Sequence, residues 1–336
     1  MGRKVALVLS SGGPRGFAYI GAIDELLARG YEISSVAGTS AGSLVGGIYA
    51  AGGLEAFKEW LFALDPMKVV RLMDFSVSKN YLVKGDRVIR AIKERVPDVL
   101  IEDLPIPFTA VSSDLYTGEE VIFREGPLFA AIRASISIPS MFRPVKWHGR
   151  TLVDGGITNT FPLNRVQRTE GDILVGFNVN RIDAESINAF RHNRLALARD
   201  EQARFSEVKT LIQETLSAGK SELIDKVRVA GARGSVLLRE QIESQKIGKD
   251  LVSVGKERHV PMGADGTYAS ILDRSFGIMN HTIARLGIEL CPPDILVDLP
   301  YDSYQGVMAY ARAKEIAEKG RGLMAEALDR YEGFQI

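Results

Sequence analysis

The strongest constraint on the fold is the alternation of short apolar runs with helical patterns near the start of the chain. The runs at 5–9 and 33–37 have the length and composition of strands buried on both faces. Each run is followed by a glycine-rich turn and a helical pattern, at 16–29 and 41–51, and a glycine follows each helix. Strands and helices that alternate in this way predict a parallel sheet with helices packed on it.

The rest of the chain continues this pattern with one interruption. Further strands are predicted at 107–112, 119–123, 151–153, 173–179 and 294–299, and helices at 54–64, 86–95 and 307–331. Residues 183–270 have few β-type runs and many charges, and their apolar residues follow helical spacing. We therefore expect a core from residues 1–182, a mainly helical insertion at 183–270, and the last part of the core from 271–336.

Composition excludes several classes of protein. The 336 residues include 42 Lys+Arg and 42 Asp+Glu, which argues against a nucleic-acid-binding protein with a strongly basic surface. The hydrophobic fraction of 46% excludes a mostly disordered chain. Cys291 is the single cysteine, so no internal disulfide forms, in keeping with a reducing compartment. The apolar run at 5–9 is too short for a signal peptide, and no run is long enough for a spanning helix. We expect a cytoplasmic protein, with peripheral membrane contact as a further option.

A candidate nucleophile lies in the sequence Gly-Thr-Ser-Ala-Gly at 38–42. This G-x-S-x-G motif follows an apolar strand and opens a helix, which is the strand–turn–helix context that a nucleophile elbow needs. Glycine lets the backbone bend sharply there. The pattern predicts that Ser40 is exposed at the strand end, beside the positive end of the helix dipole.

A second glycine-rich turn, Ser-Ser-Gly-Gly-Pro-Arg-Gly at 10–16, follows the first strand. Its backbone N–H groups favour binding of a phosphate or an oxyanion. The turn has neither the G-x-G-x-x-G fingerprint nor the Lys-Ser/Thr ending of a P-loop. Because this turn follows the strand next to the one that ends at Ser40, binding of an oxyanion explains it more simply than binding of a phosphate. Arg15 either adds positive charge or fixes the loop through a salt bridge.

Ser40 needs a general base, and the sequence leaves two candidates. Asp154 follows a short apolar strand and precedes two glycines, so its carboxylate is expected at a strand end. The alternative is a Ser-His-Asp triad that uses His192, His259 or His281. None of these histidines follows a convincing core strand, and His148 is expected in a turn.

These motifs together resemble the patatin-like phospholipase family. The resemblance rests on residues 10–22, on Gly-Thr-Ser-Ala-Gly at 38–42, and on Asp-Gly-Gly at 154–156. The segments 133–145 and 159–163, on either side of Asp-Gly-Gly, also resemble the family. The likeness covers roughly residues 4–180, with weaker similarity near 291–330.

The resemblance implies a three-layer α/β/α fold with a mostly parallel sheet, and a Ser–Asp dyad without histidine. Ser40 would form an acyl-enzyme and Asp154 would be the general base, while Gly12, Gly13, Arg15 and Gly16 would hold the oxyanion. The substrates would be acyl esters of lipids, chiefly phospholipids or lysophospholipids, and neither a metal nor a cofactor is implied.

The chain departs from the family pattern at two residues of the loop. Ser11 replaces the first of three glycines, and Pro14 has no N–H to donate. An intact but shifted oxyanion hole is expected. A lipid-binding protein without turnover remains the alternative from a different class.

Two further regions are interpreted without a motif. The insertion at 183–270 is open to four roles: a cap on the acyl groove, a dimer contact, a membrane contact, or a helical hairpin that completes the core. The oligomeric state is left open. An acyl channel near the elbow, or else the core, would use the residues Trp60, Phe62, Phe75, Tyr81 and Leu82.

Overall fold

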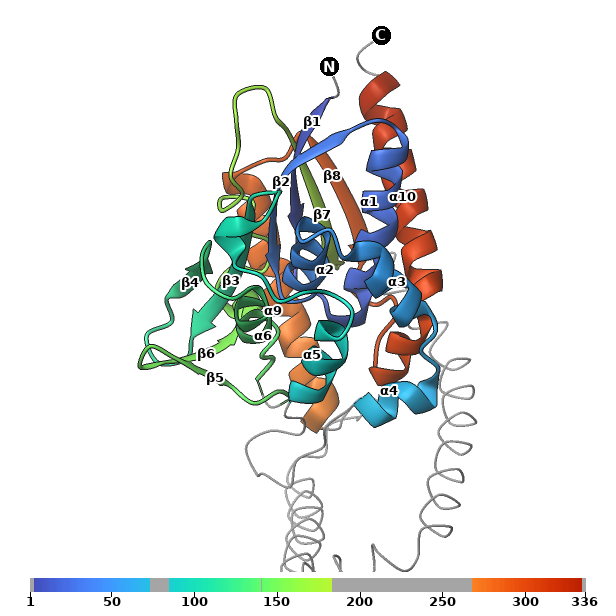
Figure 1. Ribbon diagram of the computed structural model, residues 1–336. Coiled ribbons are helices and arrows are strands. Elements are labelled where there is room, and N and C mark those ends of the chain that lie inside the picture. The colour runs from blue at the N-terminus through green and yellow to red at the C-terminus, as the bar shows by residue number, and fades with distance from the viewer. Residues whose placement is uncertain (1–2, 73–84, 140, 183–267, 334–336) are drawn as a thin grey trace, which may run out of the picture. The chain divides into compact units, whose positions relative to one another are not determined.

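The computed structural model describes residues 3–72, 85–139, 141–182 and 268–333 (Figure 1). Residues up to 182 and from 272 onward belong to one compact unit. The strands are β1 (Lys4–Leu9), β2 (Glu32–Thr39), β3 (Phe108–Asp114), β4 (Glu120–Phe123), β5 (Val145–Trp147), β6 (Arg150–Asp154), β7 (Ile173–Arg181) and β8 (Ile295–Pro300). The α-helices are α1 (Ala18–Ala28), α2 (Ala41–Ala50), α3 (Leu54–Phe62), α4 (Pro66–Leu72), α5 (Asp86–Lys93), α6 (Leu128–Ser135), α9 (Tyr268–Leu290) and α10 (Ala313–Gly333). Short 3₁₀ helices are η1 (Gly13–Phe17), η2 (Ile101–Asp103), η3 (Gly155–Ile157) and η6 (Val307–Arg312).

The described strands form one sheet in the order β5-β6-β3-β2-β1-β7-β8, with β4 also paired to β3. The pairs from β3 through β2, β1 and β7 to β8 are parallel. The pairs of β3 with β4 and β6, and of β5 with β6, are antiparallel. The parallel centre means that the carboxyl ends of β1 and β2 lie side by side, with Leu9 paired to Gly38. The two glycine-rich turns that follow these strands are therefore neighbours.

Helices cover both faces of the sheet. Alternate side chains of β1, which point to opposite faces, therefore enter two different apolar clusters. Val5, Leu7 and Leu9 pack in the larger cluster, which also contains buried residues of α1, α2 and α10. Ala6 and Val8 pack in a smaller cluster on the other face, with a contribution from α9. The predicted three-layer α/β/α fold is confirmed.

Most of the predicted elements are present with shifted ends. Two elements differ more. The helix expected at 16–29 begins with η1 and becomes α-helical only at Ala18, because the glycine loop and Pro14 precede it. The last helix is 3₁₀ at 307–312 before α10. Sequence periodicity missed α4, α6 and β5, which are short, and most of α9. The insertion expected at 183–270 lies outside the described residues, except for the start of α9.

The C-terminal helix α10 lies along α1, at the opposite end of the sequence (Figure 1). The two helices approach closely where both carry glycine. A Cβ on Gly21 would lie 1.9 Å from the Ala317 carbonyl oxygen, and one on Gly320 would lie 2.0 Å from that of Ala18. The absence of side chains at these two positions therefore sets the distance between the helices.

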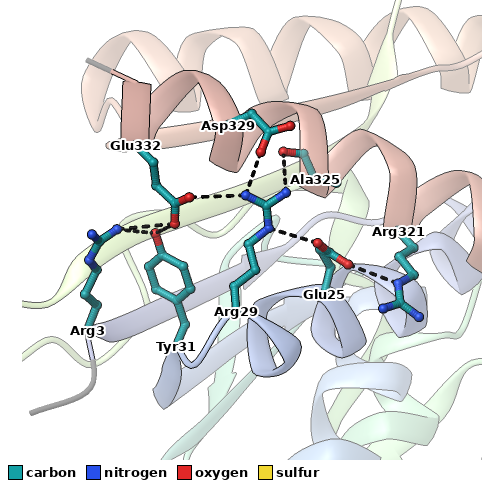
Figure 2. A network of polar contacts seen from close by, with 8 residues as sticks. All are labelled: Arg3, Glu25, Arg29, Tyr31, Arg321, Ala325, Asp329 and Glu332. Atoms are coloured by element: carbon teal, nitrogen blue, oxygen red, sulfur yellow. Dashed lines mark hydrogen bonds and ion pairs between the residues drawn. The ribbon is translucent and has the colours of Figure 1, made fainter. Parts of the chain in front are cut away.

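An ion-pair network joins the C-terminal ends of α1 and α10 (Figure 2). Arg29, at the end of α1, contacts Glu25 at 2.9 Å, Asp329 at 2.6 Å and Glu332 at 3.2 Å. Glu332 also accepts a hydrogen bond from Tyr31. The acidic groups raise the pKa of Arg29, with the hydrogen bond that Arg29 donates to Asp329 as the largest cause. Networks of this kind hold a helix end more firmly than isolated surface pairs do.

Candidate active site

Ser40 lies at the turn between β2 and α2, as predicted, but it is only 3% exposed, so its side chain is buried rather than exposed as the motif predicted. Its φ of 54° and ψ of −119° are unusual for a residue with a side chain. The turn also requires glycine on both sides. A Cβ on Gly38 would lie 2.3 Å from the Gly42 carbonyl carbon, and one on Gly42 would lie 2.2 Å from the Leu9 carbonyl oxygen. The predicted strand–turn–helix context of the motif is therefore present.

Hydrogen bonds with two serines support the strained backbone of Ser40. Its N–H donates to Ser135 Oγ at 2.8 Å, and that hydroxyl donates to the Val111 carbonyl at 2.6 Å. The Ser43 hydroxyl donates to the Ser40 carbonyl at 2.7 Å. Ser135 was not singled out from the sequence, because a serine in an apolar helix carries no signal of its contact with a distant turn.

Asp154 ends β6, as predicted, and is 5% exposed. Its Oδ1 accepts a hydrogen bond from the Gly156 N–H at 2.7 Å. The next residue must be glycine, because a Cβ on Gly155 would lie 2.3 Å from the Val111 carbonyl oxygen. Burial raises the pKa of Asp154 to about 6, against smaller lowering effects of Ser40 and of the Gly156 N–H. A carboxyl with this pKa accepts and returns a proton readily near neutral pH.

The Ser40 side chain is near enough to Asp154 to lower its pKa. Within the described part of the chain, however, Asp154 Oδ2 makes no hydrogen bond of ordinary length and angle. Hydrogen bonds between catalytic groups are often long before substrate binds. Ser11 Oγ is likewise buried without a hydrogen-bond partner among the described residues. Ser11, Ser40 and Asp154 all line one pocket.

The glycine loop borders the same pocket. Gly12 and Gly13 line it, and Gly13 begins η1, where N–H groups lack partners within the helix. A Cβ on Gly12 would lie 2.0 Å from Val179 Cγ2. Gly13 has a φ of 55°, which favours glycine. The loop is thus suited to hold an anion close to the backbone.

The Arg15 side chain joins the loop to β7 and forms no salt bridge with another described residue. It is buried, its Nε donates to the Val179 carbonyl at 3.1 Å, and its guanidinium lies 4.4 Å from the centre of the Tyr301 ring. Burial lowers the pKa of Arg15, and neighbouring tyrosines and Asp273 oppose this effect. The fourth predicted loop residue, Gly16, packs under α2, where its Cβ would lie 2.4 Å from Ala41 Cβ.

Asn180, near the end of β7, also fixes the loop. Its Nδ2 donates to the Ser11 carbonyl at 2.7 Å and to Ser10 Oγ at 3.1 Å. The Ser11 N–H donates to the Thr160 carbonyl at 2.8 Å, which joins the loop to the segment after Asp154. A polar residue at the end of the apolar run 173–179 was the available sequence signal for Asn180.

Two pockets meet at Ser40. The first, which we call the polar pocket, contains the glycine loop and Asp154, and it is lined by Ser11, Gly12, Gly13, Pro14, Arg15, Ser40, Ile138, Pro139, Met141, Asp154, Gly156, Ile157, Asp273, Phe276, Asn280, Tyr301, Gln305, Gly306 and Tyr310. The second, which we call the apolar pocket, is almost free of polar groups, and it is lined by Gly13, Phe17, Ser40, Ala41, Leu44, Phe57, Trp60, Leu61, Leu64, Val69, Leu72, Gly85, Val88, Ile92, Ile136, Ile138, Met141, Phe142 and Tyr310. Most of the lining of the polar pocket is itself apolar, and its polar groups include those of the glycine loop and Asp154. An ester at Ser40 would thus have an almost wholly apolar pocket on one side and a pocket with more polar groups on the other.

Of the aromatic residues considered for an acyl channel, Trp60 lines the apolar pocket. Phe62 does not, and packs against the main core. Three other residues considered for it lie outside the described residues, namely Phe75, Tyr81 and Leu82.

The described histidines lie away from Ser40. His281 lines neither pocket and contacts the end of β7, with its Nδ1 3.2 Å from both the Ile182 nitrogen and the Asn180 oxygen. His148 is in the turn between β5 and β6, as predicted, with a φ of 45°. His192 and His259 lie outside the described residues.

The described part of the chain contains neither a candidate metal site nor a candidate membrane-spanning helix. No group of three His, Cys, Asp or Glu side chains there could hold a metal ion. No helix in it is long and apolar enough to cross a membrane.

Comparison with known proteins identifies the family. The model of the patatin-like phospholipase family matches residues 7–166, which include Ser40, Asp154 and the glycine loop. An uncharacterized NTE family protein of Mycobacterium tuberculosis is 32% identical over 98% of this chain and 92% of its own length. The chain belongs to the patatin-like phospholipase family.

Two other relatives each match little more than half of this chain. A second uncharacterized NTE family protein of Mycobacterium tuberculosis is 36% identical over 52% of this chain and 30% of its own length. The patatin-like phospholipase domain-containing protein 6 of Mus musculus is 26% identical over 56% of this chain and 14% of its own length. The crystal structure of VipD from Legionella pneumophila aligns with a TM-score of 0.41 and 14% identity, over 97% of this chain and 67% of VipD.

Proposed function

We propose that the protein is a serine lipid acyl hydrolase of the phospholipase A or lysophospholipase type. The observation that carries this proposal is the position of Ser40, where an apolar pocket meets a polar pocket that contains Asp154 and a glycine loop. A lipid ester has the same division, with an acyl chain on one side of the carbonyl and a polar alcohol on the other. Membership of the patatin-like phospholipase family supports the same class of reaction.

In the proposed reaction, Ser40 Oγ attacks the ester carbonyl carbon and its proton passes to Asp154. The carbonyl oxygen becomes an oxyanion, which the N–H groups of Gly12 and Gly13 stabilise. The bond to the leaving alcohol then breaks, and Asp154 returns the proton to the alcohol oxygen. This leaves an acyl-enzyme on Ser40.

Water completes the cycle by the same proton path. It attacks the acyl carbonyl carbon, Asp154 accepts a proton from it, and Ser40 leaves with that proton as the fatty acid departs. The pKa of about 6 suits Asp154 to this exchange, because the group is ionised at neutral pH and is still acidic enough to return the proton.

A histidine-assisted esterase is the second candidate. It would need His192, His259 or His281 beside Ser40, and His281 contacts Asn180 and Ile182 instead. The Ser40–Asp154 dyad is therefore favoured. The substitution His281→Ala should leave hydrolysis unchanged under the dyad and abolish it under a triad that uses this histidine.

The first experiment is fluorophosphonate labelling, with the adduct located by mass spectrometry. We expect a single adduct on Ser40, lost in Ser40→Ala and strongly reduced in Asp154→Asn. Ser34→Ala is the matched control, because Ser34 lies on the same strand and lines neither pocket. Hydrolysis of phosphatidylcholine and lysophosphatidylcholine in detergent-mixed vesicles is measured in parallel.

Two results would contradict the proposal. Undiminished hydrolysis by Ser40→Ala would exclude this serine as the nucleophile. Tight binding of lipid without labelling or hydrolysis would identify a lipid-binding protein instead.

A further inference from the structure

Tyr310 brings a second hydroxyl group to the place where the two pockets meet. It lies in η6, between β8 and α10, outside the residues matched by the family model. The residues that line both pockets are Gly13, Ser40, Ile138, Met141 and Tyr310. Of these, only Ser40 and Tyr310 carry a hydroxyl.

The Tyr310 ring is held so that its hydroxyl lies over the glycine loop. The ring packs edge-on against Phe17, with centroids 5.8 Å apart. The hydroxyl oxygen lies 3.7 Å from the position that a Cβ on Gly13 would occupy. It is therefore on the side of Ser40 where the loop would receive the carbonyl oxygen of a substrate.

This hydroxyl is free to donate a hydrogen bond to a substrate. No hydrogen bond joins it to another described residue, although the ring is half-buried. Burial raises the pKa of Tyr310 to about 12, and the charge of Asp154 acts in the same direction against Arg15. The group therefore remains protonated at neutral pH, where Asp154 is ionised.

The loop itself lacks one donor. Pro14 has no N–H, so the backbone offers an anion one group fewer than an ordinary residue would allow. We propose that the Tyr310 hydroxyl is an additional oxyanion donor, which hydrogen-bonds the substrate carbonyl oxygen as charge develops on it. This inference rests on the proposed function, because it requires an acyl ester at Ser40.

The test is Tyr310→Phe, which keeps the ring against Phe17 and removes only the hydroxyl. Tyr304→Phe is the matched control, because Tyr304 lies in the preceding turn, lines neither pocket and packs its ring against Arg312. The substrates are a p-nitrophenyl ester and an alkyl ester of the same acyl chain, and wild-type protein is first checked for labelling of Ser40.

We expect Tyr310→Phe to lower kcat about 100-fold with little change in KM, on both esters alike. Tyr304→Phe should keep the wild-type kcat. A donor to the oxyanion affects both leaving groups equally, whereas a structural disturbance would change KM or thermal unfolding as well.

Each other outcome overturns the inference in a recognisable way. An unchanged kcat in Tyr310→Phe, with an active wild type, removes Tyr310 from the reaction and leaves the dyad proposal intact. A loss confined to the alkyl ester would make Tyr310 a donor to the leaving alcohol rather than to the oxyanion. A wild type that neither labels nor hydrolyses would overturn this inference and the proposed function together.

Discussion

The backbone N–H of Ser40 donates a hydrogen bond to Ser135 Oγ over 2.8 Å, which joins the turn between β2 and α2 to the end of α6. The two residues are 95 positions apart in the chain. Ser135 is fully buried, and its own hydroxyl proton goes to the Val111 carbonyl on β3. Hydrogen bonds through Ser135 thus link the turn at Ser40, with its positive φ, to both α6 and β3.

We expect Ser135→Ala to lower the free energy of unfolding by about 1–3 kcal/mol, because it leaves the buried N–H of Ser40 without a partner. The labelling rate of Ser40 should also fall. Ser43→Ala is the control: it removes a hydrogen bond to the Ser40 carbonyl, but that carbonyl also accepts from the Leu44 N–H. Urea unfolding of both variants measures the difference, and equal losses would show that the Ser135 contact has no special role.

The pH dependence of hydrolysis should follow Asp154. Because the carboxylate must accept a proton from Ser40, kcat/KM is expected to rise with pH and reach half its plateau near pH 6. A pH–rate profile between pH 4.5 and pH 8, on a substrate whose own state does not change, measures this. A profile already flat at pH 5 would mean that the base is a group with an ordinary carboxyl pKa.

Ionisation of the Asp154 carboxyl should lower the free energy of unfolding as pH rises, whereas it raises kcat/KM. Its pKa is raised from 3.8 to about 6 by burial, so the folded state holds the proton more tightly than the unfolded state. Its contribution is therefore fully present below about pH 4 and lost as pH rises through about 6. Asp154→Asn should raise the free energy of unfolding at pH 7 by up to about 3 kcal/mol. A variant less stable than wild type at pH 7 would contradict this reading of the site.

The close approach of α1 and α10 gives a matched pair of glycine substitutions in one helix. Gly320→Ala would place a Cβ 2.0 Å from the Ala18 carbonyl oxygen, whereas Gly322 has open space around it. We expect Gly320→Ala to cost about 3 kcal/mol through overpacking, and Gly322→Ala to stabilise by up to about 1 kcal/mol through helix propensity. Denaturant midpoints of the two variants test the contact, which would be refuted by similar values.

Filling the apolar pocket should change the acyl-chain length that the protein prefers without abolishing ester hydrolysis. Val88 lines this pocket from α5 and is partly buried. We expect Val88→Trp to lower kcat/KM at least about 10-fold for long-chain esters and to spare acetyl esters, because only a long chain needs the lost volume. The control is Ile122→Trp, because Ile122 is an exposed residue of β4 that lines neither pocket. An equal loss on both esters would show that the pocket does not hold the acyl chain.

Local sequence patterns were sufficient to predict the centre of the fold. The run 5–9 is apolar at every position, which is what a strand needs when its alternate side chains enter two different cores. Glycine at 38 and 42 was informative for a similar reason, because the Cβ of any other residue would collide with backbone there. The residue patterns are local and can be read along the chain, although some of the contacts that require them are not local, since Gly42 approaches Leu9 of the neighbouring strand.

Contacts between distant segments were decided only by the tertiary structure. The sequence by itself determined the alternation of strands and helices, the strand–turn–helix setting of Ser40, and Asp154 at a strand end. It did not reveal that Ser135 and Asn180 hold the two turns. Nor did it reveal that Tyr310, from beyond the last strand, lines both pockets. Hydrogen bonds and packing of this kind depend on which elements the sheet order brings together, and an isolated serine, asparagine or tyrosine carries no record of its partner.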